Sequence, residues 1–308
     1  SNTMLAGSIA DTKLLTISTA SKVSNSATTA TDANTASAIV ARDANGNFDI
    51  TSINDGPLAG NRNRIINGDM RINQRIPGSF ISYNGSGGYT IDRWNGTSST
   101  GAAIGRFEQT TDVPAGFSNS LKYTVSLDDT TTSAGDLVYL TQSIEGANVV
   151  DFLAGTASAQ AVTLSFWVKC SITGTHSGSI RYTDDGGTPA YRSYPFSYTI
   201  SAANTWEKKT ITVPGDTTAA VTIHKGVNTG YAVFFDLGSG STYEATAGSW
   251  STSNRVRVTG AVRVVATLNA TFFLTGVQLE PGAVATPFER RPIGTELALS
   301  QRYYLKTK

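Results

Sequence analysis

Short segments in which apolar and polar residues alternate recur along most of this chain of 308 residues. A period of two places successive side chains on opposite faces of a β-strand. Turn-forming residues separate the segments, and no long helical period follows Gly60 before Thr295. The apolar positions that share a face are, segment by segment, Leu121, Tyr123, Val125 and Leu127; Val162, Leu164, Phe166 and Val168; Tyr194, Phe196, Tyr198 and Ile200; and Tyr231, Val233, Phe235 and Leu237. The sequence therefore predicts an all-β fold, an antiparallel β-sandwich (jelly roll), over residues 61–290.

The last alternating segment, residues 273–280, leads into a stretch rich in proline. One parity of this segment holds Phe273, Thr275, Val277 and Leu279. That pattern predicts a strand with one buried face, which Pro281-Gly282 would end because proline lacks the N–H that a ladder needs. Beyond it we expect an extended strap, with Phe288 packed into the domain.

The first 60 residues have no apolar pattern that a single chain could bury. Between Val23 and Ile39 there is no large apolar side chain, and alanine recurs every third residue from Ala27 to Ala36. A disordered linker and a fibre shaft of several chains both fit this composition, and the regular spacing favours the shaft, residues 1–38. Asn45-Gly46 predicts a β-hairpin within residues 39–60, which would need partners because an isolated hairpin is marginal in water.

Several motifs resemble a known family. Val277-Gln-Leu-Glu, Ala285-Thr-Pro-Phe-Glu and Glu296-Leu-Ala-Leu, the last followed by Gln301-Arg-Tyr-Tyr, resemble the C-terminal receptor-binding region of bacteriophage tail fibres. Asn67-Gly-Asp-Met and Asp92-Arg-Trp resemble the start of that domain, and residues 16–48 resemble the fibre shafts. Ser300 departs from the pattern, because members often have cysteine there.

The resemblance implies a jelly-roll head similar to carbohydrate-binding modules. A trimeric fibre shaft and a β-hairpin collar would precede it, and a C-terminal extension, residues 291–308, would follow. Within the extension, either Thr295 caps a short helix that runs through Tyr303, or the pair Tyr303-Tyr304 begins a further strand. The implied partners are two other copies in a homotrimer, host cell-surface polysaccharide or lipopolysaccharide, and other phage tail proteins, in the virion.

The charge balance gives no reason to expect nucleic acid or membrane as a partner. Lys and Arg total 24 against 23 Asp and Glu, and charged residues are only 15% of the chain. No apolar run reaches the roughly 18 residues of a membrane span. Cys170 is the single cysteine, which rules out an intrachain disulfide. It shares the parity of Phe166 and Val168, so we expect a buried, inert thiol.

No constellation of catalytic residues is recognisable. His176 and His224 lie in unrelated segments, and no nucleophile elbow or phosphate loop occurs. The neighbouring carboxylates of Asp184 and Asp185 point apart, whereas glycoside hydrolysis needs two that face each other. We therefore expect no enzyme and no cofactor, although the acidic pairs leave a structural Ca²⁺ open.

Residues suited to sugars gather in two turn-rich loops. Protein sites for sugars combine flat aromatic rings with planar hydrogen-bonding groups. The candidates are Tyr182, Asp184, Asp185, Tyr191, Arg192, Tyr243 and Trp250. For Tyr182 a core position is favoured, since its parity matches Ile180, whereas Tyr191 and Trp250 fit either role.

Other aromatic and basic residues have competing interpretations. Trp167 has the parity opposite to the core and is either an exposed platform or covered by a loop. Trp94 and Trp206 are assigned to structure. Arg255 and Arg257 would suit an anionic glycan, but a solvated polar face is favoured.

Together these features predict a phage receptor-binding protein that attaches the virion to host glycan without catalysis. The alternatives are a structural collar or spacer head with no glycan site, and a glycan-degrading tailspike.

Overall fold

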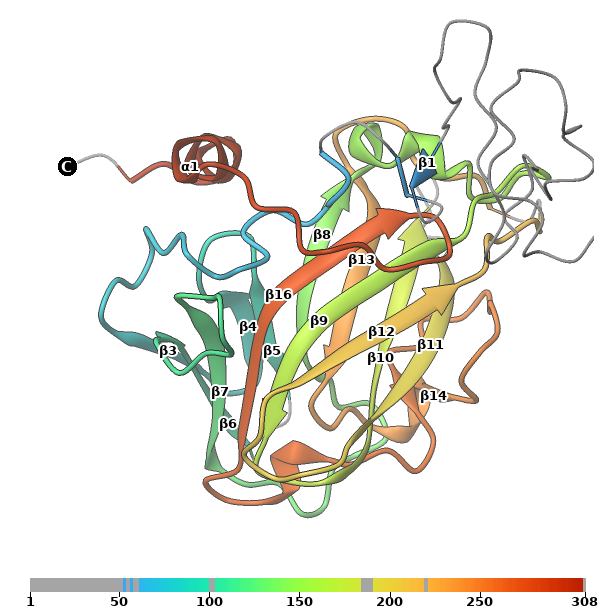
Figure 1. The fold of residues 1–308 in the computed structure, drawn as a ribbon. Coiled ribbons are helices and arrows are strands. Elements are labelled where there is room, and N and C mark those ends of the chain that lie inside the picture. Colours follow the sequence, from blue (N-terminus) through green and yellow to red (C-terminus); the bar gives the residue numbers. More distant parts are fainter. Residues whose placement is uncertain are drawn as a thin grey trace, which may run out of the picture. The chain divides into compact units, whose positions relative to one another are not determined.

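A computed structural model describes residues 61–99, 103–183, 191–218 and 221–306, and also the backbone at 52–53 and 56–57 (Figure 1). All of these belong to one unit, Ser52–Lys308. The predicted shaft and the hairpin about Asn45-Gly46 lie outside the described residues. At the start of the unit, β1 (Ser52–Ile53) and β2 (Gly56–Pro57) pair antiparallel.

Two six-stranded antiparallel sheets make up the unit. The first has the order β11 (Tyr191–Ile200), β10 (Gly174–Thr183), β13 (Thr229–Asp236), β8 (Val138–Glu145), β5 (Asn95–Ser98) and β4 (Ser86–Tyr89). The second has the order β12 (Glu207–Val213), β9 (Val162–Cys170), β16 (Thr271–Pro281), β7 (Ser120–Leu127), β6 (Ile104–Thr110) and β3 (Phe80–Tyr83). The chain crosses repeatedly from one sheet to the other, so strands distant in sequence become neighbours. This arrangement confirms the predicted antiparallel sandwich.

Shorter elements lie in the connections. A parallel pair joins β14 (Glu244–Ala245) to β15 (Arg257–Val258). Four 3₁₀ turns are η3 (Gly146–Asn148), η4 (Val150–Phe152), η5 (Ser241–Tyr243) and η6 (Val264–Ala266). The α-helix α1 (Ile293–Gln301) follows the last strand.

The core between the sheets is built from the alternating positions that the sequence singles out. All the predicted inward residues of β9, β11 and β13 are buried, and Leu237 just after β13 is buried too. Phe166 of the second sheet meets Phe235 and Tyr198 of the first edge-on, with ring centroids 5.0 and 5.1 Å apart. Leu127 is the exception, 45% exposed at the end of β7.

The predicted register of the final strand is wrong, because β16 contains a bulge. Thr275 lies opposite Trp167 and Gln278 opposite Ser165, so two residues of β16 stand against one of β9. The first, Gly276, has a φ of 59°. The bulge reverses the parity, so Phe272, Leu274, Val277 and Leu279 join the core, whereas Phe273 and Thr275 point outward.

The outward face of β16 is also covered, in contrast to the single buried face expected. Glu280 accepts hydrogen bonds from the N–H and hydroxyl of Thr286, at 2.9 and 2.6 Å. Gln278 accepts one from the N–H of Glu289 at 2.7 Å. Residues 282–292, called the strap below, are thereby held across the sheet. The motif Val277-Gln-Leu-Glu of β16 and the motif Ala285-Thr-Pro-Phe-Glu of the strap are therefore joined by hydrogen bonds into one unit.

The strap also holds the chain where it enters the sandwich. The carboxylate of Glu289 accepts hydrogen bonds from the backbone N–H groups of Asn61 and Asn63, at 2.5 and 2.7 Å. Phe288, expected in the core, instead lies half-buried on the outer face of the second sheet, because the strap runs over that face.

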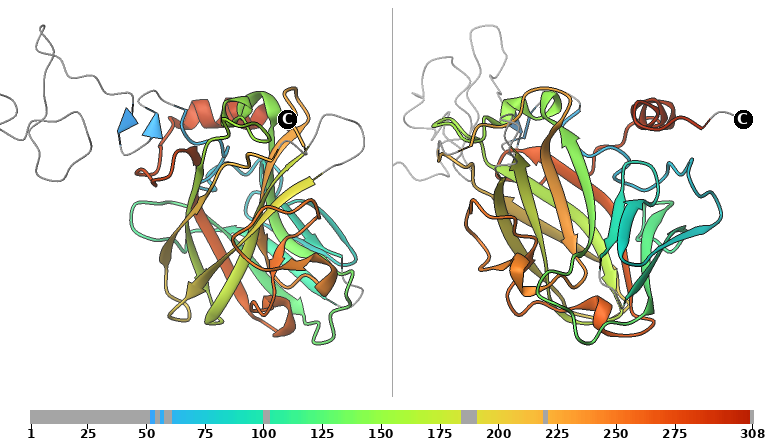
Figure 2. Two further views of the ribbon diagram at one scale, coloured as in Figure 1. Left: turned by 90° about the vertical axis from the view of Figure 1, so that its right-hand side faces the viewer. Right: turned by 180° about the vertical axis from the view of Figure 1, so that it is seen from behind.

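The C-terminal extension forms the helix rather than a strand (Figure 2). Its buried Glu296 accepts a hydrogen bond from the N–H of Asn67. The guanidinium of Arg93 lies 3.5 Å from the ring centroid of Tyr303, and that of Arg75 lies 3.9 Å from that of Tyr304. Residues at the start of the domain therefore hold α1 and the residues that follow it in place. None of the helices within the described ranges is long and apolar enough to cross a membrane.

Candidate functional site

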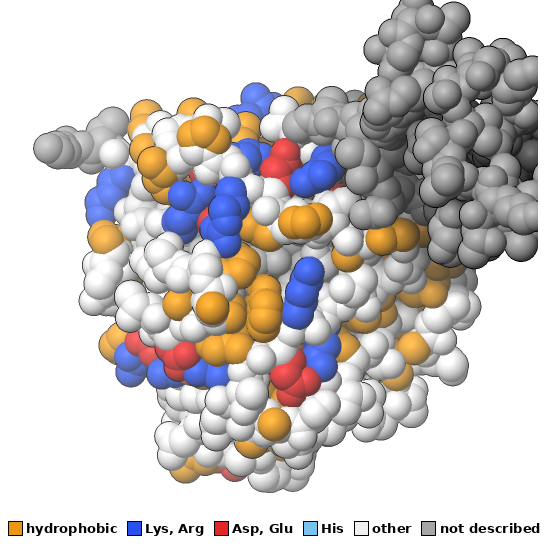
Figure 3. All heavy atoms as spheres, viewed as in Figure 1, with side chains coloured by type: hydrophobic (Ala, Val, Ile, Leu, Met, Phe, Trp, Pro, Cys, Tyr) orange, Lys and Arg blue, Asp and Glu red, His pale blue; other side chains and the backbone are white. Residues whose placement is uncertain are grey.

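A groove of about 320 Å³ opens on the outer face of the second sheet, over β12, β9 and β16. Its lining consists of Phe117, Ser165, Trp167, Lys208, Gly276, Pro287, Phe288 and Arg290. Figure 3 shows hydrophobic side chains gathered on this face, with Lys and Arg side chains around them. This volume is within the usual range of ligand sites.

The indole of Trp167 forms the floor. It stands on β9 with Lys208 of β12 opposite on one side and Thr275 of β16 on the other. The backbone of Gly276 lies against it, since a Cβ on residue 276 would come within 3.1 Å of Trp167 Cδ1 and 2.7 Å of Phe117 Cζ. The bulge therefore lets both rings approach the sheet closely, which only glycine permits.

Two phenylalanines and an arginine form the wall. The rings of Phe117 and Phe288 meet edge-on with centroids 5.3 Å apart. The guanidinium of Arg290 lies 4.7 Å from the centroid of Phe117 and donates a hydrogen bond of 2.5 Å to the carbonyl of Gly116. The wall thus joins the loop before β7 to the strap.

A row of side chains extends from the groove across the same face. The register places Phe80, Glu108, Lys122, Phe273 and Lys169 opposite one another on successive strands from β3 to β9. Trp206, assigned to structure from the sequence, is half-buried beside this row, with its ring 6.1 Å from that of Phe273. Aromatic and charged groups therefore stand side by side across the sheet.

The carboxylates beside this row are already bound by cations. Glu108 pairs with Lys122 at 3.1 Å and Arg106 at 2.6 Å, and Asp112 pairs with Lys169. Burial alone would raise the pKa of Glu108 and of Asp112. Hydrogen bonds from these partners, and from Trp206 to Asp112, outweigh burial, and each pKa lies below its ordinary value. Both carboxylates therefore stay ionised and engaged.

Two of the residues predicted to bind glycan are buried in the structure. Tyr182 is fully buried, as its parity indicated, and its hydroxyl donates a hydrogen bond of 2.8 Å to Asp216. Arg192 is buried and donates to the same carboxylate at 2.5 Å. Because both side chains are used in the interior, their assignment to glycan binding is wrong. Asp184 and Asp185 lie outside the described residues.

The remaining predicted aromatics, Trp250, Tyr191 and Tyr243, pack against other residues of the first sheet and its connections. Trp250 is half-buried, its ring 5.4 Å from those of Tyr182 and Tyr194, and its indole N–H donates to the carbonyl of Pro214 at 2.9 Å. Tyr191, at the start of β11, has the guanidinium of Arg181 at 4.6 Å from its centroid. Tyr243 packs instead against a small cluster that includes Phe234. Among the described residues, none of these three rings belongs to the lining of the groove over Trp167.

Two further polar residues, an arginine and a histidine, are buried and not solvated. Arg257, expected on a polar face, is buried between Asp236 at 2.9 Å and Glu244 at 2.8 Å. His176 is buried and stacked on Tyr198, and burial lowers its pKa. Within the described part of the chain, no three acidic, histidine or cysteine side chains form a group that could hold a metal ion.

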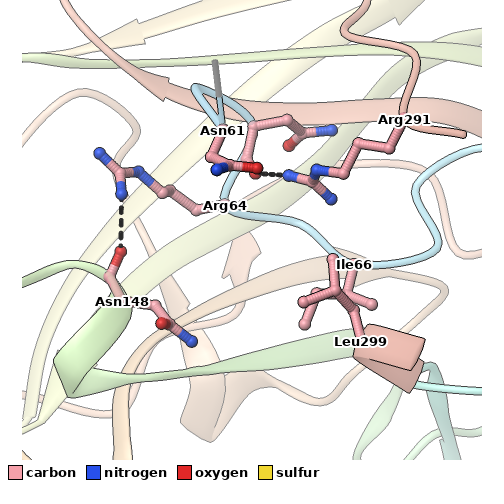
Figure 4. A pocket seen from close by; sticks show the side chains of 7 residues that line it. Asn61, Arg64, Ile66, Asn148, Arg291 and Leu299 are labelled. Carbon is pink, nitrogen blue, oxygen red and sulfur yellow. Dashed lines mark hydrogen bonds between the residues drawn. The ribbon is translucent and has the colours of Figure 1, made fainter. Parts of the chain in front are cut away.

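A second pocket of about 240 Å³ lies between the start of the domain, η3, the strap and α1 (Figure 4). Both of its arginines have carboxylate partners: Arg64 pairs with Asp151 at 2.6 Å, and Arg291 with Glu296 at 3.3 Å. Because these cations are already engaged in holding segments together, the groove over Trp167 is the stronger candidate.

Among the groove residues, only Trp167 is predicted from the sequence to stand on the outer face, either as an exposed platform or covered by a loop. Its parity opposite to the core was the signal. Phe117, Lys208 and Arg290 carry no comparable signal, because the loop and the strap bring them to the sheet from distant parts of the chain.

No protein-family model and no curated protein matches this sequence. Among solved structures, the chain is similar to the enzymatically active domain of tailspike protein 4 of bacteriophage CBA120, at 16% identity over 71% of this chain and 21% of that one, with a TM-score of 0.36. It is also similar to the CBM22-1 xylan-binding domain of Xyn10C from Paenibacillus barcinonensis, at 14% identity over 67% of this chain and 95% of that one, with a TM-score of 0.32.

A third similar structure is the xylanase Xyn10B of Clostridium thermocellum, at 10% identity over 65% of this chain and 28% of that one, with a TM-score of 0.34. The chain thus spans about a fifth of the length of the tailspike protein, at 21%. Because all three TM-scores are below 0.5, the proposals below rest on the chain's own residues.

Proposed function

We propose that this chain binds a glycan in the groove over Trp167 and acts as the receptor-binding part of a phage tail fibre. The observation that carries the proposal is the half-buried indole of Trp167, which forms the floor of a groove walled by Phe117 and Phe288. Sugars have apolar C–H faces that stack on such rings and hydroxyls that need polar partners. Ser165, Lys208 and Arg290 supply polar groups in the same lining.

The groove binds without breaking bonds. Glycoside hydrolysis uses two carboxylates that face each other across the scissile bond. Among the described residues, the groove lining contains no Asp or Glu, which favours attachment over cleavage.

Attachment to host polysaccharide or lipopolysaccharide gains strength from a trimer. The alanine spacing of residues 1–38 and the resemblance to fibre shafts support three parallel copies. Linked sites raise apparent affinity by about 10² to 10⁴ without any new contact.

Glycan-array binding of the full chain tests the proposal. We expect binding by the native protein and, for Trp167→Ala, a loss of about 1 to 3 kcal/mol per site by analogy with base stacking on aromatic rings. Tyr191→Ala, an aromatic of the other sheet, is the matched control and should bind normally. Thermal unfolding of each variant shows whether the fold is kept.

Unchanged binding by a folded Trp167→Ala variant would place the site elsewhere. A lack of binding to any glycan would favour a structural head. Release of new reducing ends from host polysaccharide would identify a tailspike enzyme instead.

A further inference from the structure

We infer that the groove selects glycans that carry acidic groups, an inference that rests on the proposed function and names its ligand class. In the part of the chain that the structure describes, the charged residues of the lining are Lys208 and Arg290, both cationic, and no carboxylate lines the groove. A ligand in this groove therefore meets positive charge that no described lining residue offsets.

The other lysines on the strands of the second sheet form ion pairs with carboxylates, and Lys208 differs from them in this respect. Lys122 pairs with Glu108 at 3.1 Å, Lys169 with Asp112, and Lys209 with Glu207 at 2.6 Å. Among the described residues, neither Lys208 nor Arg290 has a carboxylate within ion-pair distance. Both side chains belong to exposed residues, so they can meet a ligand.

The two cations approach the indole from different sides. Lys208 stands on β12, opposite Trp167, and Arg290 comes from the strap, which runs over the far side of β16. Arg290 uses one terminal nitrogen on the carbonyl of Gly116, and its guanidinium keeps further N–H donors. A planar guanidinium and a flexible ammonium in the same lining as one flat ring suit a sugar that stacks on the ring and presents carboxylate or another acidic group.

Local contact, rather than long-range attraction, must supply this preference. The whole chain carries a formal charge of only +1, too little to concentrate anions at its surface. The aromatic floor favours an acidic glycan over an acidic peptide, because a polyglutamate chain offers charge without a sugar face to stack.

The test uses the full chain and an array on which acidic glycans stand beside the same glycans with their carboxyl groups reduced to alcohols. We expect the native protein to prefer the acidic forms by about tenfold. Lys208→Gln and Arg290→Gln should each lower binding to the acidic forms about three- to tenfold and lower binding to the reduced forms by a clearly smaller factor.

Matched controls separate the groove from general charge. Lys209→Gln removes the same charge one residue away, from a lysine that already pairs with Glu207, and Arg302→Gln removes an arginine near α1 that pairs with Glu145. Both should bind like the native protein. Soluble polyglutamate should compete poorly.

Equal binding of acidic and reduced forms, with Trp167→Ala still weakening both, would overturn this inference and leave the proposed glycan binding intact. Equal losses in the controls, or strong competition by polyglutamate, would also overturn it. Failure to bind any glycan would overturn the proposed function itself.

Discussion

A side chain on Gly276 would crowd Trp167, since a Cβ built there lies 3.1 Å from the Cδ1 of the indole. The backbone at this position has a φ of 59°, which most residues adopt only with strain. The floor of the groove therefore depends on the absence of a side chain in the neighbouring strand.

Gly276→Ala should weaken both the fold and glycan binding. Backbone strain alone costs about 1 to 2 kcal/mol, and crowding of Phe117 and Trp167 adds to it. Gly260→Ala is the matched control, because Gly260 has a φ of 78° but open space around it. Thermal unfolding should show the larger loss for Gly276→Ala, and only that variant should lose binding. Equal losses of stability would mean that crowding at the indole is unimportant.

Trp250→Ala should destabilise the domain without affecting glycan binding. The ring packs against Tyr182 and Tyr194, so its removal leaves a cavity at the edge of the core that costs about 2 to 4 kcal/mol. Chemical denaturation measures the loss, with Tyr191→Ala as a milder comparison. The opposite result, lost binding with unchanged stability, would return the site to the region of residues 182–192.

Acid should destabilise the domain as Asp216 becomes protonated. Burial would raise its pKa, but hydrogen bonds from Arg192, Tyr182 and Thr218 outweigh it and lower the pKa below the ordinary value of 3.8. A depressed carboxyl pKa stabilises the fold above about pH 4, and this stabilisation is lost as pH falls through the folded-state pKa. Asp236 acts with the opposite sign, because burial raises its pKa.

Asp216→Asn isolates the contribution of Asp216. It leaves the buried guanidinium of Arg192 unpaired, which should cost about 3 to 5 kcal/mol at neutral pH. Unfolding measured from pH 2 to 7 should then show a smaller difference between variant and native protein at the acid end. Asp151→Asn breaks the exposed pair with Arg64 and should change little. A constant difference across the whole range would contradict the depressed pKa.

Cys170 should resist thiol reagents while the protein is folded. The side chain is fully buried, and burial raises its pKa to about 11, so little thiolate exists at pH 8. A maleimide should label it slowly in buffer and rapidly in denaturant, as followed by mass spectrometry. Rapid labelling in buffer would show that β9 opens readily.

The full chain should be a trimer in solution, and removal of residues 1–60 should yield monomers. This expectation depends on the alanine spacing of the N-terminal segment, which lies outside the described residues. Light scattering on both proteins at micromolar concentration measures the mass directly. A monomeric full chain would contradict the shaft and the gain in avidity.

Alternation in the sequence predicted the sandwich because one parity of each core strand, as in β9 and β13, is apolar and enters the core between the sheets. It failed at β16, where the bulge at Gly276 changes the parity partway along the strand. It also failed for Arg192, because a buried arginine is recognisable only once Asp216, far along the chain, is placed beside it. The groove could not be predicted from the sequence for a similar reason. Part of its wall comes from the strap, where no periodic pattern of apolar residues indicates which side chains face the sheet.

The hydrogen bonds that the Glu289 carboxylate accepts from the backbone of Asn61 and Asn63 have a mechanical consequence. Force applied to the chain at residues 61–63 acts directly on this carboxylate, which belongs to the strap and not to a strand. Glu289 adjoins Phe288 in the wall of the groove, so a pull on this part of the chain is transmitted to the proposed binding surface.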